Sequence, residues 1–284
     1  MAILKESYTI SHDWSGCRYL RIDIDWDYVN NEVNLPMLSY VQDTRKCFHH
    51  IQPGQKQDQS HPLVKPTYGA KAQYATNEDT SPAASPAEKK CIQEVTGIFL
   101  YYTRAVGTTM LPALGTIATQ QMNPNANTTK KVKHFLDYVS AHLDTIITYR
   151  ASNMVFATQS NTPHLSESKT RSCTGGHFFI SANSDVPANT GAVITVSKII
   201  IAVMSSATDA ELRTPIINFR EAIPTRHALN ILRHKQPPTL MQIDNTTVLG
   251  VATNTIARKC LKSIDMKPHW LCCCIAQRQF CPYW

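Results

Sequence analysis

Three stretches in the second half of the chain decide the expected fold: TIITYRASNMVFATQSN (residues 145–161), GGHFFIS (175–181) and AVITVSKIIIAVMS (192–205). They are rich in β-branched and aromatic residues and polar segments separate them, so the pattern predicts three successive strands. SSATDAEL (205–212) then begins a helix that we expect to reach about His234. LMQID (240–244) is typical of a fourth strand, and two more helical segments follow it. This order predicts an α+β fold with a mixed sheet.

The first 48 residues predict a small extended region followed by a helix. Residues 17–29, CRYLRIDIDWDYV, alternate between polar and apolar side chains, which predicts one half-buried strand. The next segment, VNNEVNLPML (29–38), predicts a turn and a second extended piece. MLSYVQDTRKCF (37–48) carries apolar residues on one side and therefore predicts a short helix.

Residues 49–90 differ in composition from the segments on either side. They are rich in Gln, Pro, Ser and charged residues, and they contain few residues that could form a core. This composition predicts a long irregular connection. Within it, we expect the imidazoles of His49, His50 and His61 to be solvated.

Helices are predicted between this connection and the strands. Ser85 is a suitable cap, and Pro86 fits the first turn of a helix that carries a 3.6-residue apolar stripe. A second helix is predicted from Thr109 to Gln121, and a third from Thr128 to His142. The helices and the strands together suit one large domain or two modest ones.

Composition bounds the class of protein. The 284 residues are 43% hydrophobic and 17% charged, which is typical of a globular chain. The net charge of +7 favours a polyanionic partner through counterion release. No apolar stretch approaches the roughly 20 residues of a membrane helix, and the amino terminus lacks a signal-peptide pattern. Nine cysteines without framework spacing favour a reduced, cytoplasmic or nuclear protein.

Several segments resemble the Pol polyprotein of copia-type LTR retrotransposons, in the order that this family has. Those similar to its RNase H domain are SNTPHLSESKTRSCTGGHFFIS (160–181), MSSATDAEL (204–212), MQIDNTTVLGVA (241–252) and KSIDMKPHWL (262–271). Those similar to its reverse transcriptase are DWSGCRYLRIDIDWDYVNNEVNLPMLSYV (13–41), YGAKAQYATNEDTSP (68–82) and IQEVTGIFLYYTRAVGTTMLPALGTIATQQMNP (92–124).

The resemblance covers nearly the whole chain and implies three parts. Residues 1–48 correspond to the end of the polymerase palm and the start of the thumb, and 49–144 to the linker and helical thumb. Residues 145–284 correspond to an RNase H-like domain that lacks its carboxyl-terminal end. The family's Tyr-x-Asp-Asp polymerase turn precedes the DWSG segment, so we expect no polymerase site in this chain.

In the family, RNase H cuts the RNA strand of an RNA–DNA hybrid with two Mg²⁺ ions about 4 Å apart. Four carboxylates hold these ions, from the first strand, the first helix, the fourth strand and the final helix. By resemblance, Glu211 is the helix acid and Asp244 the fourth-strand acid, so these two are the expected metal ligands. Asn161 takes the place of the first-strand Asp, and the fourth acid is expected beyond Trp284. Asp265 also matches a family acid, but its helix precedes the last strand, which favours a place near the hybrid.

These assignments have plain structural alternatives. Glu211 could be a solvated carboxylate at a helix start, and Asp244 could be a turn residue. An Asn161 amide is neutral and cannot bridge two dications as a carboxylate does. Mg²⁺ binding is therefore expected to be impaired and the ribonuclease lost.

Other candidate sites are less suited to chemistry. Cys272, Cys273 and Cys274, with Cys281 and His269, suggest zinc, but three consecutive cysteines on a helix point in different directions. Substitution of a charged family segment by cysteines is what unselected sequence decay leaves. His164 and Ser166 lack the strained turn of a nucleophilic triad. The Gly175-Gly176 pair predicts a close backbone approach or a bulge, and Pro215 predicts a kink or break in its helix.

Three interpretations remain open from the sequence. The first is residual ribonuclease activity on hybrids, and the second is a non-catalytic protein that binds RNA–DNA hybrid or other nucleic acid. The third is an expressed pseudogene product without a selected role. None of the three involves a membrane or a small-molecule substrate.

Overall fold

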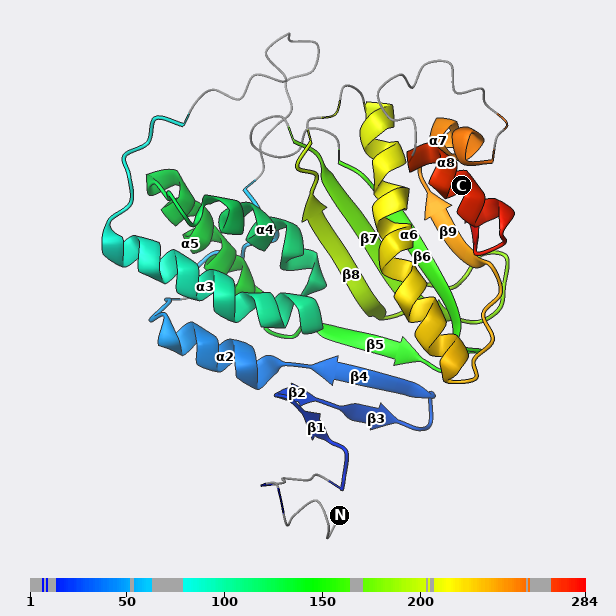
Figure 1. Ribbon diagram of the computed structural model, residues 1–284. Helices are drawn as coiled ribbons and strands as arrows, with labels where there is room; N and C mark the ends of the chain where they lie inside the picture. The colour runs from blue at the N-terminus through cyan, green and yellow to red at the C-terminus, as the bar shows by residue number, and fades with distance from the viewer. Residues whose placement is uncertain are drawn as a thin grey trace.

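The computed structural model describes residues 14–51, 54–62, 79–163, 171–202, 204, 207–253, 255 and 267–284, and the single positions 7 and 9. It is a mixed α and β structure, as the sequence predicts, with helices beside sheets (Figure 1). Among the described helices, none combines the length and the apolar character needed to cross a lipid bilayer.

A five-stranded mixed sheet forms the second half of the molecule. Its strands are β6 (Val155–Asn161), β7 (Cys173–Ser181), β8 (Ala192–Ile199), β9 (Thr239–Ile243) and β10 (Phe280–Tyr283). The order across the sheet is β10-β9-β6-β7-β8, and β7 is antiparallel to both of its neighbours. β9 is parallel to β6 and to β10. The predicted fourth strand is therefore confirmed, and it pairs with the first strand of the sheet.

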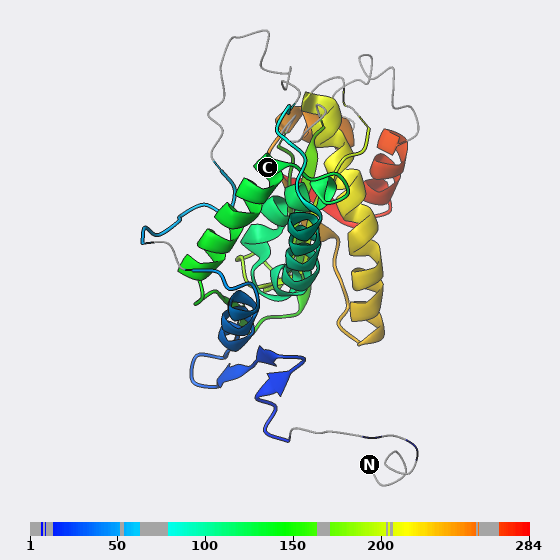
Figure 2. The same ribbon diagram turned by 90° about the vertical axis from the view of Figure 1, so that its left-hand side faces the viewer.

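Helices cover one face of this sheet. α6 (Ala207–Ile231) packs on β6 and β7, while α7 (Thr246–Ala252) and α8 (Lys267–Ala276) pack beside it. Figure 2 shows α6 and α8 together on one side of the molecule, away from α5. Alternate residues of the strands supply the core beneath α6, among them Phe156, Phe178, Val196, Met241 and Ile243. Strand periodicity of two thus separates an apolar face from a polar one.

The first half combines a small sheet with helices. β3 (Asp25–Asp27), β4 (Glu32–Pro36) and β5 (Ile146–Arg150) form an antiparallel sheet in that order. The helices are α2 (Leu38–Cys47), α3 (Pro86–Ala105), η2 (Thr108–Met110), α4 (Leu111–Gln120) and α5 (Ala126–Ala141). They enclose a separate core in which Phe99 and Phe135 are fully buried, with ring centroids 5.4 Å apart. The predicted helices are confirmed to within a few residues.

Three of the predicted strands are wrong in extent, and the one predicted over 192–205 ends at Ile199. Residues 17–29 do not form one strand, because Leu20 and Arg21 have positive φ angles of 48° and 66° and turn the chain. They separate β1 (Arg18–Tyr19) from β2 (Ile22–Asp23), which pair with each other. Residues 145–161 form two strands, because β5 pairs with β4 whereas β6 belongs to the large sheet. Alternation of polar and apolar residues predicts extended backbone, but it does not predict which strand each segment pairs with.

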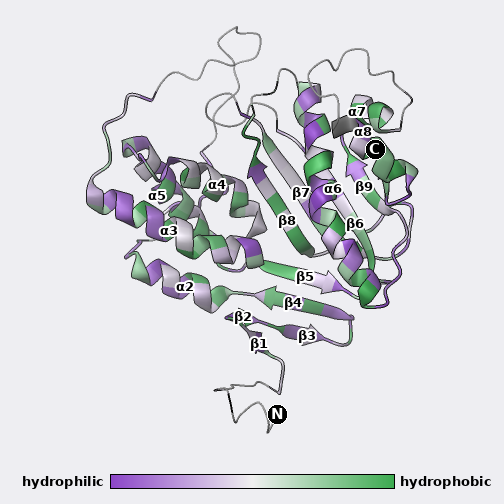
Figure 3. Ribbon diagram, viewed as in Figure 1, coloured by the Kyte–Doolittle hydropathy of each residue, from purple (hydrophilic) through white to green (hydrophobic). Residues whose placement is uncertain are grey.

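The predicted break at Pro215 is also wrong. α6 is a single helix of 25 residues that contains both Pro215 and Pro224 (Figure 3 shows its hydrophilic and hydrophobic bands). A proline inside a helix costs about 3 kcal/mol. Leu212, Ile216 and Phe219, on either side of Pro215, are buried against the sheet. Burying three such side chains contributes about 1.5–3 kcal/mol each, which exceeds the cost of the proline.

Candidate functional site

Two of the expected site residues lie at the same edge of the five-stranded sheet. Asn161 is the last residue of β6, and Asp244 follows the last residue of β9. These strands are parallel, and their register ends with Ser160 opposite Ile243. Asn161 and Asp244 are the next residues of the two strands, so they are neighbours at the carboxyl ends. Both side chains are exposed.

Glu211 reaches this edge from α6, in the second turn of the helix. Its Oε2 accepts a hydrogen bond from Nδ2 of Asn245, the residue after Asp244. Asn245 also caps α7, because its Oδ1 accepts from the backbone N–H groups of Thr247 (2.8 Å) and Val248 (3.1 Å). Asn245 therefore joins the starts of two helices to the end of β9.

Asn245 is a site residue that sequence reasoning missed. The signal for it was an Asn before Thr-Thr and an apolar helix, which is the pattern of an N-cap. Its second contact, to Glu211, depends on the packing of α6 and could not be read from local sequence. Asp265, His164 and Ser166 lie outside the described residues.

The donors at this edge do not fit a pair of Mg²⁺ ions. Mg²⁺ prefers carboxylate oxygens, and two adjacent dications need several of them. Glu211 and Asp244 supply two carboxylates, and Asn161 supplies a neutral amide whose Oδ1 accepts the Thr162 N–H at 2.5 Å. In the described part of the chain, no group of three or more His, Cys, Asp or Glu side chains is arranged to hold a metal ion.

The cysteines of α8 point in different directions. Cys272 and Cys274 are buried, and Cys273 is exposed. The Cys272 thiol donates to the Val251 carbonyl over 3.5 Å. Burial, with a smaller effect of Cys273, raises the pKa of the Cys274 thiol. Zinc binds thiolates, so a raised thiol pKa opposes a zinc site here.

A buried polar contact holds α6 against the sheet close to the site. Asn218 is fully buried, and its Nδ2 donates to Ser160 Oγ (3.0 Å) and to the Gly175 carbonyl (2.9 Å). A Cβ on Gly176 would lie 2.5 Å from Asn218 Oδ1. The predicted close approach at the Gly175-Gly176 pair is therefore confirmed, and the neighbour is this asparagine.

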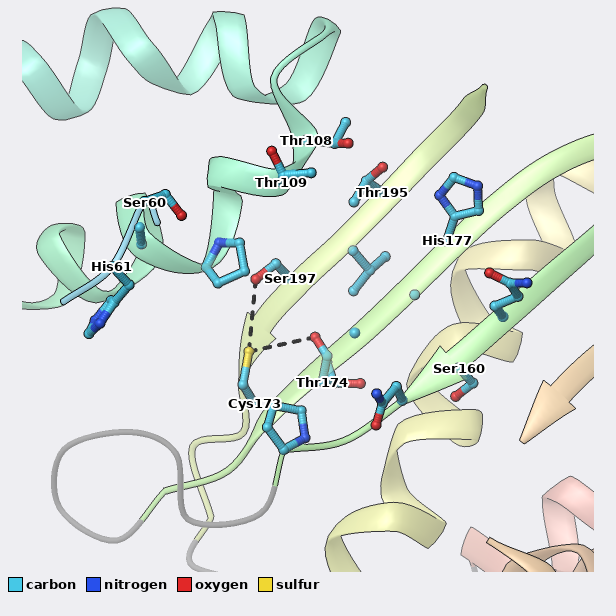
Figure 4. A pocket seen from close by; sticks show the side chains of 18 of the residues that line it. Ser60, His61, Thr108, Thr109, Ser160, Cys173, Thr174, His177, Thr195 and Ser197 are labelled. Carbon is cyan, nitrogen blue, oxygen red and sulfur yellow. Dashed lines mark hydrogen bonds between the residues drawn. The ribbon is translucent and has the colours of Figure 1, made fainter. Parts of the chain in front are cut away.

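A cavity of about 800 Å³ opens on the face of the sheet opposite α6. It includes Asn161 and Asp244 at one end, and it extends across β6, β7 and β8 toward η2 and α4. Figure 4 shows His177, Thr195 and Ser197 on neighbouring strands, with Ser60 and His61 on a separate segment across the cavity. The candidate site therefore lies at one end of this cavity.

No protein-family model matches the chain, and a search of curated proteins found no match.

Proposed function

We propose that this chain is a non-catalytic nucleic-acid-binding remnant of a copia-type reverse transcriptase and RNase H. The supporting observation is the meeting of Asn161, Glu211 and Asp244 at one edge of the mixed sheet. The resemblance assigns these positions to the first strand, first helix and fourth strand of an RNase H-like domain. Segments 34 or more residues apart in the chain come together there through the β6–β9 pairing and the Glu211–Asn245 hydrogen bond.

The ribonuclease activity of the family is lost in this proposal. Two carboxylates carry too little negative charge to hold two divalent cations close together. Asn161 is the substituted ligand, and its amide oxygen already accepts a backbone N–H. What remains at the edge is a hydrogen-bonding surface without the charge that phosphodiester hydrolysis requires.

We assign nucleic-acid binding to exposed lysines on α5, in the part of the chain that resembles the polymerase thumb. Lys130 and Lys133 are exposed on α5, whereas Lys131 is half-buried and its Nζ donates to Gln120 Oε1 (3.4 Å). Exposed lysines bind phosphates by releasing condensed counterions, so the affinity should be weak, independent of sequence and strongly dependent on salt.

The first experiment tests the loss of catalysis. We expect the purified chain to leave a labelled RNA–DNA hybrid intact in Mg²⁺, and we expect Asn161→Asp alone to change Mg²⁺ binding little in calorimetry. Hybrid cleavage that requires Mg²⁺ and disappears in Glu211→Gln would contradict the proposal. Cleavage that persists in Glu211→Gln identifies a contaminating nuclease and is removed by further purification before scoring.

The second experiment tests the binding surface with two charge-matched double variants. Lys130→Gln/Lys133→Gln removes two charges from α5, and Arg233→Gln/Lys235→Gln removes two exposed charges after α6. Each phosphate contact contributes about 0.9 to the slope of log K against log salt on duplex DNA. The α5 variant should therefore lower the slope by about two, whereas the α6 variant should leave it nearly unchanged.

A lower salt slope in the α6 variant, with no change in the α5 variant, would place the binding surface at the end of α6 and would contradict the α5 assignment. Absence of binding at low salt would contradict nucleic-acid binding altogether, and would leave the interpretation of a product without a selected role.

A further inference from the structure

Four polar side chains form a row across the sheet face that α6 does not cover. The register pairs Gln242 with Gln159, Gln159 with His177, and His177 with Thr195, on β9, β6, β7 and β8. Residues paired in register project from the same face, with neighbouring strands about 4.8 Å apart. The four side chains therefore lie side by side, and all but Gln242 are at least partly buried.

A second row of paired residues lies two positions further along β6, at its carboxyl end. Asn161 pairs with Gly175, and Gly175 pairs with Ser197. Gly175 carries no side chain, so the floor is hollow between its two neighbours. Ser197 Oγ lies 3.8 Å from the thiol of Cys173, which is buried on the same face. Both rows line the 800 Å³ cavity, and Asp244 is at its edge.

The wall that faces this polar floor combines methyl and ring carbons with a few polar groups. It is formed by η2, the start of α4 and the segment that carries Ser60 and His61, and the helical part consists of Thr108, Thr109, Pro112, Ala113 and Thr116. Figure 4 shows Thr108 and Thr109 across from Thr195. A ligand between floor and wall would meet hydrogen-bonding groups on one side and methyl and ring carbons on the other.

The polar groups of the floor have hydrogen-bonding capacity to spare. In the described part of the chain, no side chain or backbone group is hydrogen-bonded to the amides of Gln159 and Gln242, and the buried Thr195 hydroxyl has no partner. His177 Nε2 donates to the Thr190 carbonyl (3.1 Å), which leaves Nδ1 as an acceptor in the neutral imidazole. Amides, hydroxyls and imidazole together offer both donors and acceptors.

The charge of the lining restricts the ligand. Among the described residues that line the cavity there is no Lys or Arg, and Asp244 is the one carboxylate. A phosphate or carboxylate ligand would find no Lys or Arg inside, only the imidazoles of His61 and His177, and would be repelled by Asp244 at the edge. The ligand should therefore be neutral, with a polar edge directed at the floor and an apolar part that contacts the wall.

We propose that this cavity binds an unpaired nucleobase, presented as a nucleoside or as one nucleotide of a single strand whose phosphates remain outside. Amide side chains bind the edges of bases, and unpaired bases are recognised through these edges in single-stranded nucleic acid. A volume of about 800 Å³ lies within the usual range of roughly 300–1,000 Å³ for ligand sites. The choice of a nucleobase among neutral heterocycles rests on the proposed function.

The test uses the whole chain and four neutral probes: adenosine, guanosine, cytidine and uridine. We expect at least one to bind in calorimetry or ligand-observed NMR, with an affinity that changes less than about twofold between low and high salt because the ligand is uncharged. Gln159→Leu and Thr195→Val conserve side-chain volume and remove hydrogen-bonding groups. Each should weaken binding about threefold to tenfold, as expected for one lost hydrogen bond.

A matched control is Thr225→Val, which makes the same change on α6, on the other side of the sheet. It should leave nucleoside binding unchanged. Equal weakening by Thr225→Val, no binding of any nucleoside, or equally tight binding of methyl ribofuranoside, which has no base, would each overturn the proposal.

The nucleoside experiment and the salt-dependence experiment on nucleic acid can fail independently of each other. Nucleoside binding without salt-sensitive binding of nucleic acid would retain the base site and overturn the proposed function. Salt-sensitive binding of nucleic acid with no nucleoside binding would overturn the base site alone.

Discussion

At the scale of single residues, Asn218 and Gly176 position the candidate site more directly than its carboxylates do. Asn218 ties α6 to β6 through Ser160 and to β7 through the Gly175 carbonyl. The asparagine fits only because residue 176 has no side chain, since a Cβ there would be 2.5 Å from Asn218 Oδ1 and 2.8 Å from the Phe178 ring. This contact holds the middle of α6 on the sheet, about two helical turns after Glu211.

Gly176→Ala should destabilise the protein by about 1–3 kcal/mol, as overpacking of a well-packed core does. Gly97→Ala is the matched control, because a Cβ there meets nothing within 4 Å. Gly97 lies inside α3, so its replacement by alanine should be neutral or stabilising by up to about 1 kcal/mol. Urea unfolding of the two variants measures both effects. Equal stability of Gly176→Ala and the wild-type protein would contradict the close packing described here.

At the scale of elements, α3 has a capping box that its sequence predicted in part. Ser85 Oγ accepts from the Glu88 N–H (3.3 Å), and Glu88 Oε2 accepts from the Ser85 N–H (2.8 Å). These bonds satisfy backbone donors at the start of a 20-residue helix that forms much of the first core. The hydrogen bond from the Ser85 backbone, followed by that from its side chain, lowers the pKa of the Glu88 carboxyl.

Ser85→Ala should cost about 1 kcal/mol of stability, the usual effect of losing an N-cap. The pKa of Glu88 is lower in the folded than in the unfolded chain. Its contribution to stability is therefore complete above the ordinary pKa of 4.5 and decreases as the pH falls below it. Glu88→Gln retains the capping geometry without a titrating group. Thermal unfolding of this variant should change less between pH 7 and pH 4 than that of the wild type, and an equal pH dependence would argue against the box.

At the scale of the whole molecule, imidazoles hold the connection after α2 against α5. His50 was expected to be solvated, and this expectation is wrong: its side chain is 10% exposed, and its Nε2 lies 2.8 Å from Asp137 Oδ1. His134 and His142 donate to the carbonyls of Gln59 (2.9 Å) and Gln57 (2.9 Å). The connection is polar, as its composition predicts, but its partners on α5 and at the C-cap residue His142 are 75 or more residues away.

His134→Ala combined with His142→Ala should release this segment without unfolding the helices. Two lost hydrogen bonds amount to about 1–3 kcal/mol of local stability. Cleavage by trypsin after Lys56 should become faster, while α3 remains resistant. His49→Asn is the control, because His49 is exposed and its φ of 48° suits asparagine. An unchanged cleavage rate in the double variant would show that the two imidazoles do not anchor the segment.

The sequence by itself determined which segments are extended and which are helical wherever the cause is local. The Ser85-Pro86 start of α3 and the strand patterns of residues 175–181 and 240–244 depend on caps, side-chain shape and periodicity, which neighbouring residues carry. It also named Asn161, Glu211 and Asp244 as candidates, through the resemblance on which the proposed function rests.

Only the tertiary structure decided which of these segments meet. The division of 145–161 between two sheets, the continuity of α6 through Pro215 and the contact of Asn245 with Glu211 each depend on partners far away in the chain. The same holds for the polar rows that line the cavity, because a row across four strands is set by register and not by any one strand. Packing energy and strand pairing act between distant residues, and no local pattern records them.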